Sequence, residues 1–500
     1  MNRLARMSAA TLALLCAFTI GAGVAVVRLL PARLALFEMP QVSGARLATP
    51  GSALLAATGS ASGGATAAGV SASLSAIMGS GDLGSADGGM VLDLATGRVL
   101  YSLNADVGFT PASTTKLATA VAALDVLGPA ARFATMVRQG AAASQLVLVG
   151  GGDPTLAAGA YPLADYPQPA TLRALAGATA RSLRAEGIAA VRLSYDDRLF
   201  TGQEQALGWP ALGAPDNYIF TGNVAPITGL EVDQGRLTAL GKPEDADDPG
   251  NLSARSLHPG LDAVHAFASF LRRDGIAVRG KSARTSARAR GPVIAEVRSP
   301  ALAQIVQWML SESNNVIAET LARQVALATG KPGTFSGAAA AVMAVDRGLG
   351  VTGIQIHDGS GLSPDDLISP QSLVNLVALA AGFGPAGSAG AAGSAGATGA
   401  VRPAHIGLRS VLTGLPVAGF SGTLGPGSFF GPFGQAALGT VRAKTGNLKA
   451  VATMAGLAYA RDGQLLAFAF MGNKFSAKDQ LLVENTLAQL ATALASCGCR

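Results

Sequence analysis

The chain has 500 residues, enough for two or three domains, and 49% of its residues are apolar whereas 14% are charged. This balance excludes a disordered polyelectrolyte. The formal net charge is +6, but only 5% of the residues are aromatic and basic residues do not interleave with them, which argues against nucleic-acid binding. The four histidines show no spacing typical of metal ligands, so we expect no metal and no cofactor.

Residues 1–40 predict a membrane anchor or a signal segment. Arg3 and Arg6 precede an uncharged run over 7–27, which is long enough to span a bilayer, and the basic flank predicts a cytoplasmic N-terminus. A cleaved signal peptide is the alternative, because Gly23-Val24-Ala25 supplies small residues at the right spacing after a shorter apolar core. Residues 41–84 are rich in Gly, Ala and Ser and predict a flexible linker. With either a membrane anchor or a cleaved signal peptide, we expect the folded part to lie outside the cytoplasm.

The first folded elements are predicted between residues 90 and 124. Apolar stretches at 90–94 and 98–102 flank a turn that contains a glycine, and they predict a hairpin at the start of the main sheet. Thr110 followed by proline predicts the start of a helix that runs to Leu124, with Ser113 in its first turn. This helix is almost entirely small and apolar, so we expect it to be buried.

Residues 138–290 are interpreted as an inserted domain, because they carry strand-like stretches and far more chain than the flanking parts require. Strand patterns return near the C-terminus, followed by a helical pattern, at 440–444, 450–459, 465–471 and 478–494. The first and last segments must then share one sheet. We therefore predict a catalytic domain built from residues 85–137 and 291–500, an α/β fold with an antiparallel sheet flanked by helices.

Three short motifs occur in order, Ser113-Thr114-Thr115-Lys116, Ser313-Asn314-Asn315 and Lys444-Thr445-Gly446, and together they are typical of enzymes that acylate an active-site serine. A serine and a lysine three residues apart on a helix share a face, so Lys116 can take the proton of Ser113 during attack. This requires burial and nearby positive charge to keep the lysine partly neutral. Ser102-Leu103-Asn104 also fits the second pattern, but it precedes the nucleophile at a strand end.

The remaining motif residues have expected roles around this pair. Ser313 relays the proton towards the leaving amine, and Asn315 holds the substrate amide or Lys116. Lys444 supplies positive charge and, with Thr445, binds a substrate carboxylate, while Gly446 lets substrate approach the strand edge.

Longer stretches around these motifs resemble the serine-type D-alanyl-D-alanine carboxypeptidases, the class C penicillin-binding proteins. The resemblance runs from about residue 85 to about residue 485 and is carried by the segments around Ser113, Gly150-Gly151-Gly152-Asp153-Pro154, Asp358-Gly359-Ser360-Gly361-Leu362, Gly422-Thr423-Leu424 and Arg442-Ala443-Lys444. The second and third of these separate the family from class A β-lactamases. We interpret Asp153 and Asp358 as residues that order turns.

The resemblance implies a penicillin-binding-protein and β-lactamase-like transpeptidase domain with an inserted second domain. It implies an oxyanion hole made by the backbone N–H groups of Ser113 and Asn447, although a Thr or Ser is expected where Asn447 stands. Because the donor is backbone, we expect Asn447 to leave acylation intact and to alter side-chain selectivity.

The resemblance also implies a function, a D-alanyl-D-alanine carboxypeptidase, with endopeptidase action on crosslinks left open. Its partners are peptidoglycan stem peptides ending in D-Ala-D-Ala, β-lactams as covalent inhibitors, and the membrane through the N-terminal segment. Two alternatives are a β-lactamase and a non-catalytic envelope-binding protein that keeps the fold.

Overall fold

The structure is a computed structural model that describes residues 65–159, 166–203, 205–206, 208–237, 254–285, 290–384, 407–427 and 433–499. The predicted anchor or signal segment, residues 1–40, lies outside these residues. Of the helices within the described ranges, none combines the length and the apolar character needed to cross a bilayer.

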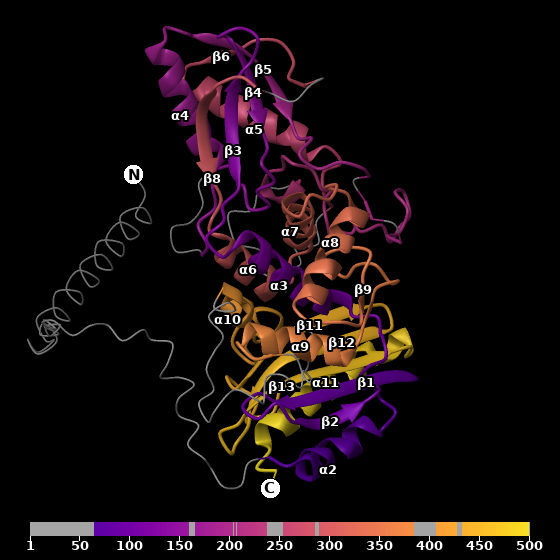
Figure 1. Ribbon diagram of the computed structural model, residues 1–500. Helices are drawn as coiled ribbons and strands as arrows, with labels where there is room; N and C mark the ends of the chain where they lie inside the picture. The colour runs from indigo at the N-terminus through magenta and orange to yellow at the C-terminus, as the bar shows by residue number, and fades with distance from the viewer. Residues whose placement is uncertain are drawn as a thin grey trace, which may run out of the picture. The chain divides into compact units, whose positions relative to one another are not determined.

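A five-stranded antiparallel sheet joins the two ends of the described chain, as predicted. Its strands, in spatial order, are β11 (Val441–Leu448), β12 (Val451–Tyr459), β13 (Leu465–Asn473), β1 (Ala86–Asp93) and β2 (Val99–Leu103). β1 pairs with β13 over its whole length, which places the indigo start of the fold against its yellow end in Figure 1. Both β11 and β2 are edge strands.

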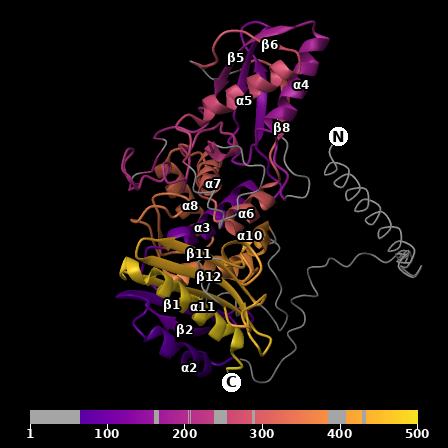
Figure 2. The same ribbon diagram turned by 180° about the vertical axis from the view of Figure 1, so that it is seen from behind.

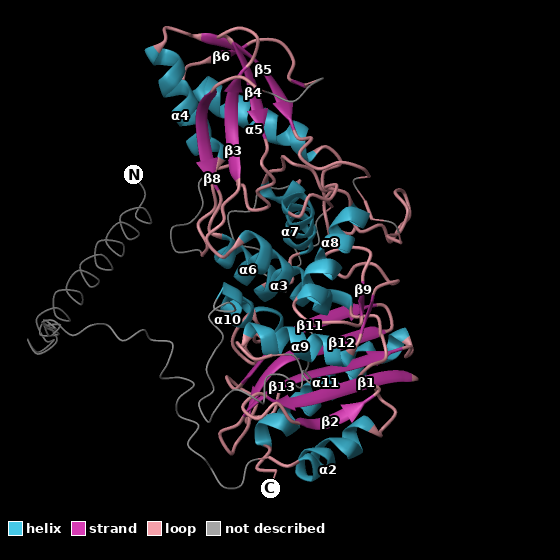
Figure 3. Cartoon of the chain, viewed as in Figure 1, coloured by secondary structure: helices cyan, strands magenta, loops and turns pink. Residues whose placement is uncertain are grey.

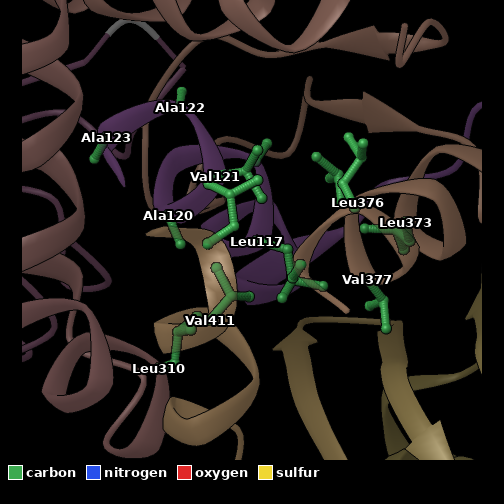
Figure 4. Packing of buried hydrophobic residues seen from close by; sticks show 14 of the residues in the cluster. Leu117, Ala120, Val121, Ala122, Ala123, Leu310, Leu373, Leu376, Val377 and Val411 are labelled. Atoms are coloured by element: carbon green, nitrogen blue, oxygen red, sulfur yellow. The ribbon is translucent and has the colours of Figure 1, made fainter. Parts of the chain in front are cut away.

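Helices cover both faces of this sheet (Figure 3). One face packs on α2 (Ala67–Met78) and α11 (Gln480–Ser496), and the other packs on α9 (Pro370–Ala380). Behind α9 lie the helices of a buried bundle: α3 (Lys116–Leu127), α6 (Leu302–Ser311), α7 (Asn315–Ala328), α8 (Phe335–Gly348) and α10 (Arg409–Gly414). Figure 4 shows the hydrophobic cluster between α3, α6, α9 and α10, which includes Leu117, Val121, Leu310 and Val377. The burial predicted for the Ser113 helix is confirmed.

Helix α2 contradicts the C-terminal part of the flexible linker predicted over residues 41–84, whereas residues 41–64 lie outside the described residues. Thr66 caps the helix by accepting the N–H of Gly69, and Val70, Leu74 and Met78 are buried against the sheet and α11. These three residues repeat every fourth position, so they form one apolar face. Glycine and alanine dominate the local composition, and this concealed the face from a compositional argument.

A second, six-stranded sheet comes from one continuous part of the chain. Its strands are β3 (Ala134–Gln139), β4 (Gln145–Val149), β5 (Ala190–Asp196), β6 (Ala277–Val278), β7 (Ala283–Arg284) and β8 (Val293–Arg298). Helices α4 (Leu172–Ala185) and α5 (Pro259–Arg273) pack on it around a core that includes Phe267 (Figure 2). The predicted insertion, 138–290, begins inside β3 and ends before β8, so this sheet extends past both of its limits.

The chain between β5 and α5 returns to the helical bundle. Trp209 packs edge-on against Phe335 of α8, with ring centroids 5.2 Å apart, and its Nε1 donates to Asp358 Oδ2 at 2.9 Å. Asp358 lies between two short paired strands, β9 (Ile354–Gln355) and β10 (Leu367–Ile368). This segment therefore reaches the region where the predicted motifs meet.

Candidate active site

The predicted nucleophile, Ser113, lies in a short 3-10 helix, η2 (Ala112–Thr115), that continues directly into α3. The sequence predicted one helix that starts at Thr110, and this start is wrong. Ala112 has a φ of 48°, a left-handed conformation that interrupts a helix, and the Thr110 N–H donates to Asn473 Oδ1 at 2.9 Å. Ser113 is nevertheless in the turn ahead of α3 and is half-buried.

Two threonine hydroxyls stabilise this turn, one from within it and one from the sheet. Thr114 Oγ1 and Thr453 Oγ1 each donate to the Pro111 carbonyl at 2.7 Å. Thr453 belongs to β12 and pairs with Gly446 of β11. A Cβ added to Gly446 would lie 2.5 Å from Pro111 O and 3.0 Å from Ser113 N. Glycine is therefore required here because the nucleophile turn packs directly on β11.

Lys116 is fully buried, and its amine lies among three oxygen acceptors. Nζ is 2.9 Å from Ser113 Oγ, 2.7 Å from Asn315 Oδ1 and 2.8 Å from Ser360 O. The structure thus brings Asn315 of the second motif to Ser113 and Lys116 of the first, although about 200 positions separate the two motifs in the sequence.

A second lysine is buried in the same region. Burial, and after it the charge of Lys116, lowers the pKa of Lys444 well below its usual value. Burial also lowers the pKa of Lys116 to about 7, while the charges of Asp358 and Glu319 raise it. An amine with such a pKa is largely neutral at slightly alkaline pH, so Lys116 is able to accept a proton from a serine hydroxyl.

The loop between α6 and α7 carries the second motif. Ser313 adopts a φ of 54° in this loop and is half-buried. Asn315 is the first residue of α7, and its Nδ2 donates to Asn223 O at 2.9 Å. Asn314 caps α7, and its Nδ2 donates to Gln234 Oε1 at 2.9 Å, away from Lys116.

The outer edge of β11 presents the third motif. The Ala443 N–H donates to Pro416 O at 3.0 Å, on the side opposite β12. Alternate residues of an antiparallel strand direct their N–H groups to the same side, so those of Thr445 and Asn447 also point away from β12. Thr445 Oγ1 lies 2.8 Å from Thr423 Oγ1, a residue of the Gly-Thr-Leu segment that carries the resemblance.

The side chain of Asn447 is exposed, yet its polar groups are engaged. Nδ2 donates to Glu484 Oε1 at 2.6 Å, and Oδ1 accepts from Gln480 Nε2. Both partners lie on α11. The backbone N–H of Asn447 thus belongs to the free strand edge, while its side chain is held against the neighbouring helix.

Several groups of this arrangement were not predicted. The carbonyls of Ser360 and Asn223 have no sequence signal, because every residue carries a carbonyl. Glu319 does have a sequence signal, because it follows Asn315 by four residues and so lies on the same face of the helix. Asp358 does order a turn, as interpreted from the sequence, by accepting the N–H of Gly361 at 2.7 Å. In the described residues, no cluster of three or more His, Cys, Asp or Glu is arranged to hold a metal ion.

The chain matches the D-Ala-D-Ala carboxypeptidase 3 (S13) family over residues 70–248, 232–389 and 403–494. It belongs to this family. The predicted class, a serine-type D-Ala-D-Ala carboxypeptidase of the penicillin-binding-protein group, is therefore confirmed.

Two relatives support this membership of the S13 family, and one solved structure shares the fold. A carboxypeptidase of Mycobacterium tuberculosis is 35% identical over 438 residues, which is 87% of this chain and 85% of the relative. The carboxypeptidase DacB of Mycolicibacterium smegmatis is 33% identical over 437 residues, 87% of this chain and 85% of its own. Penicillin-binding protein 4 of Haemophilus influenzae shares the fold, with a TM-score of 0.62 at 22% identity over 84% of this chain and 97% of that one.

Proposed function

We propose that this protein removes the terminal D-alanine from peptidoglycan stem peptides through an acyl-enzyme on Ser113. The observation that carries the proposal is the environment of Lys116 Nζ, which lies 2.9 Å from Ser113 Oγ and close to two further acceptors. Membership of the S13 family supplies the class of substrate.

Acylation begins with transfer of the serine proton. A neutral amine has two N–H groups and one lone pair, and the two N–H groups bond Asn315 Oδ1 and Ser360 O. The lone pair is then directed at the Ser113 hydroxyl. As Oγ attacks the peptide carbonyl, Lys116 takes the proton and becomes an ammonium with three acceptors.

The developing oxyanion is bound by the N–H groups of Ser113 and Asn447. Both lie at the junction of the nucleophile turn and β11, where Gly446 allows close approach. Lys116 then returns its proton, through Ser313, to the amine of the departing D-alanine. Lys444 and the Thr445 hydroxyl bind the carboxylate of that residue, and water later releases the acyl group from Ser113.

The same chemistry opens a β-lactam ring, because that ring also presents an amide carbonyl to Ser113. The amine produced stays attached to the acyl group, so the product blocks the site until water removes it. We propose β-lactams as covalent inhibitors of this protein on that basis.

Release of D-alanine tests the proposal directly. The full chain is incubated with a pentapeptide that ends in D-Ala-D-Ala and with one that ends in L-Ala-L-Ala. We expect D-alanine from the first peptide only, and none from either with Ser113→Ala. Ser194→Ala on β5 serves as the matched control and keeps wild-type activity. Unchanged release by Ser113→Ala contradicts the proposal, and crosslinked peptides in the same assay measure endopeptidase action.

We further propose that the N-terminal segment holds the enzyme at the outer face of the membrane. Family membership indicates an extracytoplasmic protein, since peptidoglycan lies outside the cytoplasm. The basic residues before the apolar run over 7–27 support a cytoplasmic N-terminus. Recovery of the full-length mass in the membrane fraction is expected for an anchor, whereas a shortened secreted form indicates a cleaved signal peptide.

A further inference from the structure

The Ser360 carbonyl is the only acceptor of the Lys116 amine, among the contacts of the described residues, that comes from the backbone. A side-chain acceptor such as Asn315 is fixed by its own helix. A backbone carbonyl is fixed only as well as the loop that contains it. The direction of the Lys116 lone pair therefore depends on what holds residues 358–363.

Glu319 of α7 holds this loop through its backbone. Its Oε1 and Oε2 each accept the Gly359 N–H at 3.0 Å, and Oε1 also accepts the Ser360 N–H at 2.7 Å. Glu319 is fully buried, and it stands one helical turn after Asn315. One face of α7 thus supplies Asn315 as a direct acceptor of Lys116. The same face fixes the loop of the Ser360 acceptor through the Glu319 carboxylate.

Close packing leaves this loop little freedom on its other sides. A Cβ on Gly359 would lie 2.6 Å from Ala322 Cβ in α7, and a Cβ on Gly361 would lie 1.9 Å from Ala112 O in the nucleophile turn. Thr119 Oγ1 of α3 donates to the Gly359 carbonyl at 2.7 Å. The loop packs between α7 and the turn that carries the nucleophile. A small shift of the loop therefore changes the position of the Ser360 carbonyl.

We propose that Glu319 is a positioning residue for acylation: its carboxylate fixes the Ser360 carbonyl and thereby aims the Lys116 lone pair at Ser113. The inference rests on the proposed function, because it takes Lys116 as the base. A glutamine of the same shape replaces one carboxylate oxygen by an NH₂ group, which cannot accept a backbone N–H, so at least the Oε2 contact with the Gly359 N–H is lost and the loop is held less firmly.

The charge of Glu319 also acts on Lys116, and other charged groups face the same amine. Asp358 and Glu319 raise the pKa of Lys116 against the effect of burial, which lowers it to about 7. Lys444 on β11 also lies near this amine, because the charge of Lys116 lowers the pKa of Lys444 after the larger effect of burial. Loss of the Glu319 charge removes one of the two effects that raise the pKa, so the pKa of Lys116 falls further.

Glu319 has charged neighbours of its own. Burial and then the charge of Asp358 raise its pKa to about 8, whereas the N–H groups that it accepts and the charge of Arg323 lower it. Burial and the Asp358 charge also raise the pKa of Asp366 to about 10, so this group is neutral at neutral pH. The carboxyl of Glu319 and the amine of Lys116 therefore titrate in the same range as an interacting pair.

The test is the rate of acylation by benzylpenicillin, measured on the full chain between pH 5 and pH 9 for wild type and Glu319→Gln. At the plateau of the profile we expect a loss of about tenfold to a hundredfold, from misorientation of the base. We also expect the acid limb to move to lower pH. The matched control is Asp346→Asn, another fully buried carboxylate, on α8, where neither the rate nor the limb changes.

The outcomes separate the two claims. A wild-type chain that is not acylated contradicts the proposed function, and the inference falls with it. If wild type is acylated, a folded Glu319→Gln with a rate within twofold of wild type overturns the inference alone. A lower rate with an unmoved acid limb also overturns the inference, because a merely structural role moves no pKa.

A second variant applies if Glu319→Gln does not fold. Thr119→Val removes the hydroxyl that holds the Gly359 carbonyl, without a change of charge. We expect a severalfold loss in the acylation rate with the acid limb unmoved. A wild-type rate in this variant shows that the loop does not need to be fixed, and it overturns the inference.

Discussion

The five-stranded sheet and the six-stranded sheet contribute to the site in different ways. The first supplies an entire motif from β11, and it packs directly on the turn that carries Ser113. From the second, the chain that follows β5 supplies partners for the second motif, the carbonyl of Asn223 and the amide oxygen of Gln234. Residues that perform chemistry thus come from one sheet and its helices, whereas the other region contributes groups that hold them.

Loss of the catalytic base in the first region should have the largest effect on activity. Lys116→Ala removes the base and leaves the Ser113 hydroxyl without a proton acceptor. We expect the rate constant for acylation by a fluorescent penicillin to fall by about a thousandfold or more. Lys281→Ala, an exposed lysine after β6, is the control and keeps the wild-type rate. A loss below tenfold in Lys116→Ala assigns the base to another group.

The pH dependence of acylation should follow the same lysine. Burial lowers the pKa of Lys116 to about 7, so the amine is protonated and inactive below that pH and neutral above it. We expect the rate to rise about tenfold per pH unit on the acid side and to level off on the alkaline side. Rates that stay flat between pH 5 and pH 9 contradict this assignment.

A smaller effect measures the link between the two regions. Gln234→Ala removes the amide oxygen that accepts from Asn314 Nδ2, at the cap of α7. We expect a severalfold lower acylation rate and a loss of about 1 kcal/mol in the free energy of unfolding. Gln145→Ala on β4 is the control. If both variants match wild type, the second region does not support the motif.

Asn447→Thr tests the division between backbone and side chain on β11. The N–H that points to the free edge is unchanged, so acylation by benzylpenicillin should change by less than about threefold. The amide that contacts Glu484 and Gln480 is lost, and we expect altered selectivity between peptides that differ in the side chain before D-Ala-D-Ala. A large loss of acylation shows that the side chain itself takes part.

The smallest expected effect on activity comes from the core of the second sheet. Phe267 of α5 is fully buried, and Phe267→Ala should lower the free energy of unfolding by about 3 to 5 kcal/mol. We propose that the six-stranded sheet, with α4 and α5, unfolds before the five-stranded sheet does, so acylation at 20 °C stays at the wild-type rate. Phe468→Ala, in the core of the five-stranded sheet, should lower both the free energy of unfolding and the rate of acylation. Equal loss of acylation in the two variants contradicts this order of unfolding.

Much of the first region could be predicted from the sequence, because its strands are apolar runs next to turn residues and its motifs place specific side chains at fixed spacing. The hairpin of β1 and β2 is one example, and the presence of the first and last strands in one sheet is another. The contribution of Ser360 and Asn223 could not be predicted, since it is made by carbonyls. The predicted start of the Ser113 helix is wrong because Ala112 takes a left-handed conformation, which the helical pattern of the sequence does not indicate.

The measurement that tests the central claim most directly is the intact mass of the full chain after exposure to benzylpenicillin, with peptide mapping of any adduct. We expect one adduct per chain, on the peptide that contains Ser113, and none in Ser113→Ala. An adduct on another residue, or an unmodified chain with the drug unconsumed, would contradict it. Rapid consumption of the drug without an adduct would instead indicate a β-lactamase.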